Sequence, residues 1–223
     1  MRAKALLLLL LCVAFTAQSQ DLNSIISRAK SEARSRVRSE VNKAENRIRS
    51  GNFNYDKTVT ITFEKLPTTL DELKALPEAS MDTPYKVVAL CMAVLCNYEN
   101  DREATFEMLD YLCRPNSGTE YEAFHKFISE RLRDGKGYKA FAFFEGATPD
   151  NNYTPTVPYK IKVSSNSVSF NEKNRARLMV KSGGADSPGP VMLREKPSTG
   201  QWFVTQISCL TDIRLPAALD EWR

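Results

Sequence analysis

A continuous apolar run from Val87 to Cys96 constrains the fold of this 223-residue chain more than any other sequence feature. The run follows Thr83 and Pro84, and both residues favour the start of a helix. Ten apolar residues are too few to cross a bilayer, and they leave a helix without a polar face. The sequence therefore predicts a helix over residues 84–96 that the protein itself covers on all sides.

The first twenty residues have the three parts of a secretory signal. Arg2 and Lys4 form the charged start, residues 5–15 form the apolar part, and a small polar end follows. We expect a signal peptide over residues 1–19, and therefore export to the periplasm, the cell surface or the medium. A retained membrane anchor and a lipid-modified Cys12 are less favoured, because the apolar part is short and a bulky residue precedes that cysteine. After cleavage the chain is not expected to be an integral membrane protein.

The positive charge of the chain lies in its N-terminal arm. The whole chain has a formal net charge of +4. Residues 21–50 hold eight Lys/Arg and four Asp/Glu, whereas residues 51–223 hold 21 Lys/Arg and 23 Asp/Glu. Weakly apolar residues recur in the arm at eleven-residue intervals, which gives a nearly straight helical stripe. We expect an exposed charged helix or spacer over residues 20–50 and a linker over 51–57. Self-association through residues 22–49 is an alternative. The body has no excess positive charge, so nucleic-acid binding is not expected.

Residues 58–223 are predicted to form a single domain of helices and strands. Apolar alternation predicts strands over residues 58–63, 159–163, 176–180, 191–195 and 201–207, with a hairpin turn at 197–200. Helices are predicted over residues 70–76, 84–96, the segment that Asn100 caps, and 120–133. Helices that precede most of the strands indicate the α+β class. We expect an N-terminal helical block on one face of a mainly antiparallel sheet of about five strands.

The sequence offers few groups for catalysis. It lacks the motifs HExxH, GxSxG and SxxK. His125 is the single histidine, at the edge of the apolar stripe of the fourth predicted helix, where a packed or half-exposed histidine is more common than a catalytic one. No catalytic, metal-binding or cofactor-binding residue is predicted, and no cofactor is expected.

Four cysteines remain after signal cleavage: Cys91, Cys96, Cys113 and Cys209. Two of them, Cys91 and Cys96, point apart on one predicted helix, and Cys113 is expected beyond easy reach of Cys91. No CxxC motif is present. We interpret all four as small buried apolar residues, although an exported protein could pair them, so their disulfide state stays open.

Two polar loops are the remaining candidate binding surfaces. They span residues 146–158 and 183–190 and are rich in Pro, Gly and Asn or Ser. Tyr153 is the candidate contact in the first loop. Glu145 and Asp150 flank the same loop and could serve a glycosidase-like carboxylate site. Such loops are also common as plain connections.

Three segments resemble an uncharacterised bacterial domain family. They are FEKLPTTLDELKALPEAS (63–80), ATPDNNYTP (147–155) and GADSPGPVMLREKPSTGQWF (184–203). The resemblance covers most of residues 58–216 and leaves out the signal and the charged arm. It implies exported or surface proteins without an assigned activity, and it implies no catalytic residue.

Our leading functional hypothesis is a non-enzymatic exported binding or interaction module of the bacterial cell envelope. It follows from the signal, the stalk-like arm and the missing catalytic motifs. The first alternative is a hydrolase with an unrecognised carboxylate site in the loops 146–158 or 183–190. The second alternative is a structural subunit of a homo-oligomer. The sequence does not identify the ligand or partner.

Overall fold

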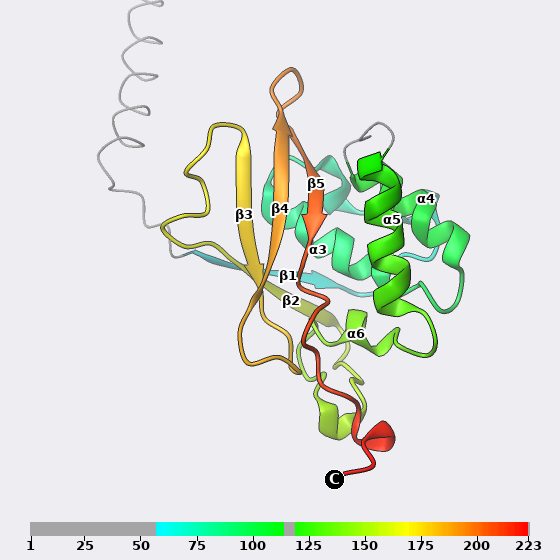
Figure 1. Cartoon of the computed structure of the whole chain (residues 1–223). Helices are drawn as coiled ribbons and strands as arrows, with labels where there is room; N and C mark the ends of the chain where they lie inside the picture. Colours follow the sequence, from blue (N-terminus) through cyan, green and yellow to red (C-terminus); the bar gives the residue numbers. More distant parts are fainter. Residues whose placement is uncertain (1–56, 114–118, 223) are drawn as a thin grey trace, which may run out of the picture. The chain divides into compact units, whose positions relative to one another are not determined.

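The computed structural model describes residues 57–113 and 119–222. The signal peptide predicted over residues 1–19 and the charged helix predicted over 20–50 lie outside the described residues. In chain order the described elements are β1 (Thr58–Phe63), α2 (Leu70–Ala75), the 3₁₀ helix η1 (Pro77–Ser80), α3 (Pro84–Leu95), α4 (Arg102–Leu112), α5 (Thr119–Leu132), α6 (Tyr138–Phe141), η2 (Pro149–Asn151), β2 (Tyr159–Ser164), β3 (Arg175–Val180), β4 (Gly189–Lys196), β5 (Gln201–Ile207) and η3 (Ala217–Leu219) (Figure 1).

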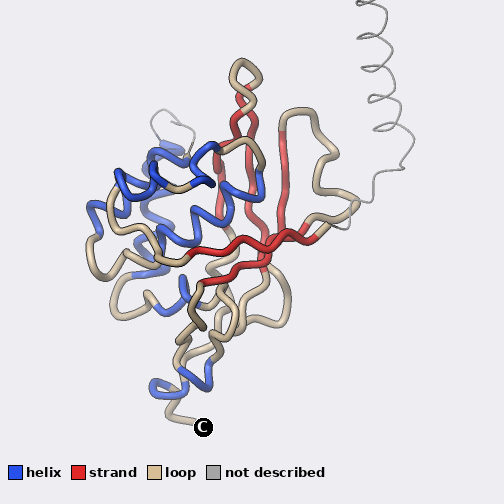
Figure 2. The backbone as a smooth tube through the Cα atoms, turned by 180° about the vertical axis from the view of Figure 1, so that it is seen from behind, coloured by secondary structure: helices blue, strands red, loops and turns tan. Residues whose placement is uncertain are grey.

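The five strands form one antiparallel sheet in the order β1-β2-β3-β4-β5. Helices precede four of the strands and pack with the sheet, so the predicted α+β class is confirmed. Strands β2 and β3 pair only at Val163–Val180 and Ser164–Met179. The sheet therefore splays at this point, and Figures 1 and 2 show β1 and β2 crossing the direction of β3, β4 and β5.

Helix α3 is the centre of the core, as its apolar run predicts. Thr83 is its N-cap, with the side-chain oxygen accepting from the backbone N–H of Lys86 at 3.5 Å, and Pro84 lies in the first turn. Every residue from Val87 to Leu95 is fully buried. The helix contacts α4 and strands β1, β2, β3 and β5, and each large side chain so buried contributes roughly 1.5–3 kcal/mol.

The α-helices differ from the prediction at the cap of α4 and at α6. Asp101, not Asn100, caps α4, because its carboxylate accepts from the backbone N–H of Ala104 at 2.9 Å. Helix α6 was not predicted, since four residues are too few to show an apolar period. It follows a turn in which Asp134 and Gly135 have left-handed backbone conformations. Across residues 57–113 and 119–222, no helix has the length and apolar character to cross a membrane.

Candidate functional site

The two loops proposed as binding surfaces pack against each other. A Cβ atom at Gly184 would lie 2.0 Å from the Tyr153 hydroxyl, so the 183–190 loop runs directly over the 146–158 loop. Tyr153 donates a hydrogen bond from this hydroxyl to the backbone carbonyl of Arg214 at 2.8 Å. Its side chain is buried. Tyr153 therefore joins the two loops to the C-terminal segment and does not offer a surface contact.

The two carboxylates of this region do not form a recognisable acid–base pair. Glu145 accepts from Lys162 at 2.7 Å, and this hydrogen bond lowers the pKa of the Glu145 carboxyl. A glycosidase acid needs the opposite shift, so that it keeps its proton near neutral pH. Asp150 lies in the short helix η2 and is exposed. Among residues 57–113 and 119–222, no cluster of three or more His, Cys, Asp or Glu side chains could hold a metal ion.

His125 lies in a packed position between α4 and α5. Its Nε2 atom is 2.9 Å from Asp110 Oδ1, and the Tyr121 hydroxyl donates to Asp110 Oδ2 at 2.7 Å. The imidazole stacks on Phe106, with 4.3 Å between ring centroids. The Asp110 carboxylate of α4 thus binds the Tyr121 and His125 side chains of α5. We call these three residues the joint between α4 and α5.

Cys113 lies close to this joint but is not an activated nucleophile. Burial raises the pKa of its thiol, and the nearby Asp110 carboxylate raises it further. Burial also raises the pKa of Cys91, with smaller contributions from Cys113 and Cys209. All four described cysteines are free. The predicted burial is confirmed for Cys91, Cys96 and Cys209, whereas Cys113 is half-buried.

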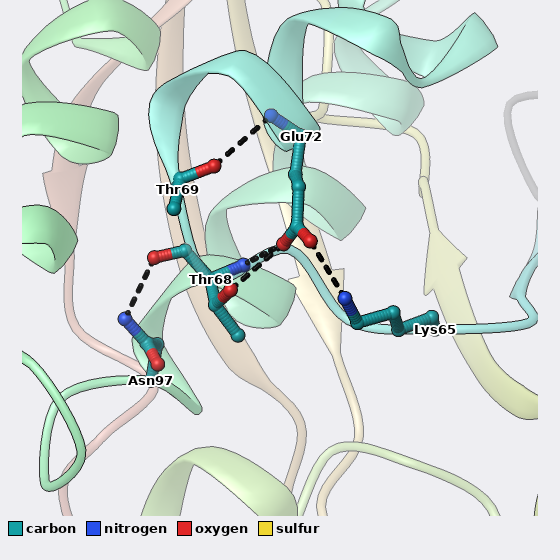
Figure 3. Close-up of polar contacts among 5 residues, drawn as sticks. All are labelled: Lys65, Thr68, Thr69, Glu72 and Asn97. Carbon is teal, nitrogen blue, oxygen red and sulfur yellow. Dashed lines mark hydrogen bonds and ion pairs between the residues drawn. The ribbon is translucent and has the colours of Figure 1, made fainter.

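A polar network at the start of α2 is also structural (Figure 3). Glu72 accepts from the backbone N–H and the hydroxyl of Thr68, both at 2.8 Å, and from Lys65 Nζ at 2.6 Å. The Thr69 hydroxyl accepts from the Glu72 N–H at 3.2 Å, which is half of the predicted capping box. Asn97 at the end of α3 donates to the Thr68 carbonyl at 3.2 Å. The groups satisfy one another and hold α2 against the end of α3.

The candidate binding site is a groove that sequence reasoning missed. It has a volume of about 570 Å³ and lies between α5 and strands β3, β4 and β5. Figure 1 shows α5 beside the β5 edge of the sheet. Phe124 and Phe127 of α5 line one side, and Met192, Arg175 and Arg194 line the other. We call these five side chains the arginine groove.

The arginines of the sheet are arranged in a way that costs stability. Arg175 of β3 is directly opposite Arg194 of β4 in the strand register, and like charges in such pairs are destabilising. Arg177 lies two residues along β3 and therefore on the same face. Arg175 forms an exposed ion pair with Glu172 at 3.2 Å, whereas Arg194 has no ion-pair partner in the described part of the chain. The groove thus carries positive charge next to apolar walls.

A signal for this site exists in the sequence, but it is weak. Arg177 and Arg194 occupy outward positions of two predicted strands, and Arg175 directly precedes the first of these strands. Their spacing along each strand predicts a common face, but only the pairing of β3 with β4 places Arg175 opposite Arg194. The position of α5 at the sheet edge depends on tertiary packing and has no local signal.

The comparisons with known proteins identify a domain but no activity. Residues 65–217 match the model of a family described as a domain of unknown function (DUF6935). The expected resemblance to an uncharacterised domain family is confirmed at that level. No curated protein and no solved structure matches the chain significantly.

Proposed function

We propose a function from the geometry, since the chain belongs to DUF6935, a domain family of unknown function. The protein is an exported, non-enzymatic binding module. Its arginine groove holds an acidic polypeptide segment of a partner in the cell envelope or outside the cell. The observation that carries this proposal is the groove itself, in which arginine side chains and aromatic side chains face one space.

The chemistry of the groove favours an acidic peptide that also has apolar side chains. Arg175 and Arg194 can each bind a carboxylate through two parallel hydrogen bonds. Phe124, Phe127 and Met192 provide apolar contact area, which suits Leu, Ile or Phe side chains. Burial of Glu or Asp between the two arginines would also relieve their mutual repulsion.

Export is part of the proposal and is supported by the first residues of the chain. Arg2, Lys4 and the apolar stretch after them have the pattern of a cleaved secretory signal over residues 1–19. The charged segment over residues 20–50 then serves as a tether or spacer for the body. Expression of the full chain in a bacterial host tests this, because the exported product should begin near residue 20 by mass measurement. Full-length protein in the cytoplasm would contradict export.

Binding at the groove can be tested with a labelled peptide of alternating Glu and Leu. Fluorescence anisotropy with the mature chain should show saturable binding, and a Lys/Leu peptide of equal length should not bind. Arg194→Gln should weaken binding about tenfold, because a charge-assisted hydrogen bond is worth roughly 1.5–3 kcal/mol. Lys181→Gln, at an exposed lysine outside the groove, is the matched control. Equal affinities of the wild type and Arg194→Gln would refute the groove as the site.

A further inference from the structure

The last described residues of the chain expose large apolar side chains close together. Leu215, Leu219 and Trp222 have exposed fractions of 51%, 55% and 95%. They are three of the seven large apolar side chains that the described residues expose, and the other four are spread over residues 121–170. We call residues 215–222 the C-terminal tail. Exposed apolar side chains that are grouped in this way are typical of a contact with another molecule.

The C-terminal tail is also acidic. It contains Asp220 and Glu221 and no Lys or Arg. Neither carboxylate forms an ion pair with a described residue. Asp220 Oδ1 accepts only a local hydrogen bond, from the backbone N–H of Trp222 at 3.0 Å. The tail therefore combines negative charge that no described cation neutralises with exposed apolar side chains, which is the chemistry that suits the arginine groove.

The tail lies away from the groove of its own molecule. Its Ala218 donates a hydrogen bond from the backbone N–H to Asn152 Oδ1 at 2.9 Å, and η3 contacts η2. Figure 1 shows the C-terminus beyond α6, whereas the groove lies between α5 and the strands. None of the described residues that line the groove belongs to the tail. The groove of one molecule is therefore open to the tail of another.

We propose that the C-terminal tail of one molecule occupies the arginine groove of a second copy of this chain. The inference rests on the proposed function of the groove and names its occupant. Asp220 and Glu221 accept hydrogen bonds from the guanidinium groups of Arg175 and Arg194. These two arginines are directly opposite each other in the strand register, so the carboxylates relieve a repulsion that is already present in the free groove.

Trp222 provides the apolar part of the contact. Its side chain is almost fully exposed in the free tail, and it packs against Phe124 and Phe127 in the groove. Tryptophan side chains bury a large area and often dominate the energy of an interface. Because tail and groove are different surfaces, two molecules that exchange tails form a closed dimer, and one-way contacts form longer chains.

Sedimentation velocity of the mature chain tests the contact. The average mass of the wild type should rise above the monomer mass as the concentration increases. Trp222→Ser and Arg194→Glu should stay monomeric at concentrations where the wild type associates. Val168→Ser, at an exposed apolar residue outside the tail and the groove, is the matched control and should associate as the wild type does. A monomeric wild type, or association that persists in Trp222→Ser, would overturn the proposal.

A mixture of the two variants separates loss of the contact from loss of folding. Trp222→Ser keeps an intact groove, and Arg194→Glu keeps an intact tail. An equimolar mixture should therefore contain a complex of the two chains, although each variant alone is monomeric. Association through another segment, such as residues 22–49, would not show this complementation. A mixture that contains only monomers would contradict the proposal.

A labelled peptide of residues 215–223 separates failure of this inference from failure of the proposed function. Fluorescence anisotropy should show saturable binding to the Trp222→Ser chain, and the Glu/Leu peptide should displace it. The same peptide with Asp220→Asn and Glu221→Gln should bind at least tenfold more weakly. If the Glu/Leu peptide binds and the tail peptide does not, the groove remains a peptide site and the tail is not its occupant. If neither peptide binds, both proposals fail.

Discussion

Glu72 shows how one side chain can make part of the fold sensitive to acid. It accepts from Lys65 and from both donors of Thr68, and the hydrogen bond from Lys65 is the main reason that its pKa falls to about 2. The folded protein therefore binds fewer protons at this site than the unfolded chain. The stabilisation is present above about pH 4.5 and is lost as the pH falls towards 2.

We expect Glu72→Gln to lower the free energy of unfolding at pH 7 and to have a smaller effect at pH 2.5. Urea unfolding across this pH range measures the difference. Glu221→Gln, at an exposed position near the C-terminus, is the control and should follow the wild type. A Glu72→Gln penalty that is the same at both pH values would contradict the assigned role of its charge.

Gly183 is needed for the contact between the two polar loops. A Cβ atom at this position would lie 1.9 Å from the backbone carbonyl oxygen of Ala147, which cannot rotate away as a side chain can. We expect Gly183→Ala to destabilise the protein by about 1–3 kcal/mol, the usual cost of forced overpacking. Ser187→Ala, at an exposed position of the same loop, should have little effect. Thermal unfolding compares the two, and equal melting temperatures would contradict the packing of these loops.

At the scale of the elements, the joint between α4 and α5 depends on Asp110. Its carboxylate accepts from the Tyr121 hydroxyl, and this hydrogen bond raises the pKa of Tyr121 to about 12. The folded state thus retains a proton that the unfolded chain loses near pH 10. The stabilisation is complete below pH 10 and disappears as the pH rises towards 12.

Asp110→Asn should return the pKa of Tyr121 towards 10, because the acceptor loses its charge. Absorbance at 295 nm during an alkaline titration follows tyrosinate formation, and Tyr121→Phe assigns the affected residue. Tyr153, whose pKa burial raises to about 12, should titrate unchanged in Asp110→Asn and serves as an internal control. An identical titration curve for the wild type and Asp110→Asn would show that the joint does not form.

At the scale of the whole molecule, the reactivity of the cysteine thiols measures whether the core is closed to solvent. Cys91, Cys96 and Cys209 are buried, and burial raises the pKa of each thiol. We expect the mature chain, purified without reductant, to react slowly with Ellman's reagent when folded. It should release four equivalents in guanidinium chloride. Fewer than four would reveal a disulfide. Because Cys113 is half-buried, rapid reaction of more than one thiol in the folded protein is the result that would show that α3 is not enclosed.

Much of the fold could be predicted from the sequence because its signals are local. The apolar run of α3, the Thr69 cap of α2 and the alternation of β1 each depend on residues that are close neighbours in the sequence. The error of one residue at the cap of α4 has the same origin, since Asn100 and Asp101 are both good caps and only the observed hydrogen bond distinguishes them.

The sequence by itself determined the elements of this protein, their class and the buried central helix, because backbone propensity and apolar period act over a few residues. Only the tertiary structure decided the candidate sites. Strand register placed Arg175 opposite Arg194, and the packing of α5 beside β5 formed the second wall of the groove. These contacts join segments whose separation along the chain carries no periodic signal, so side-chain packing and strand pairing had to specify them.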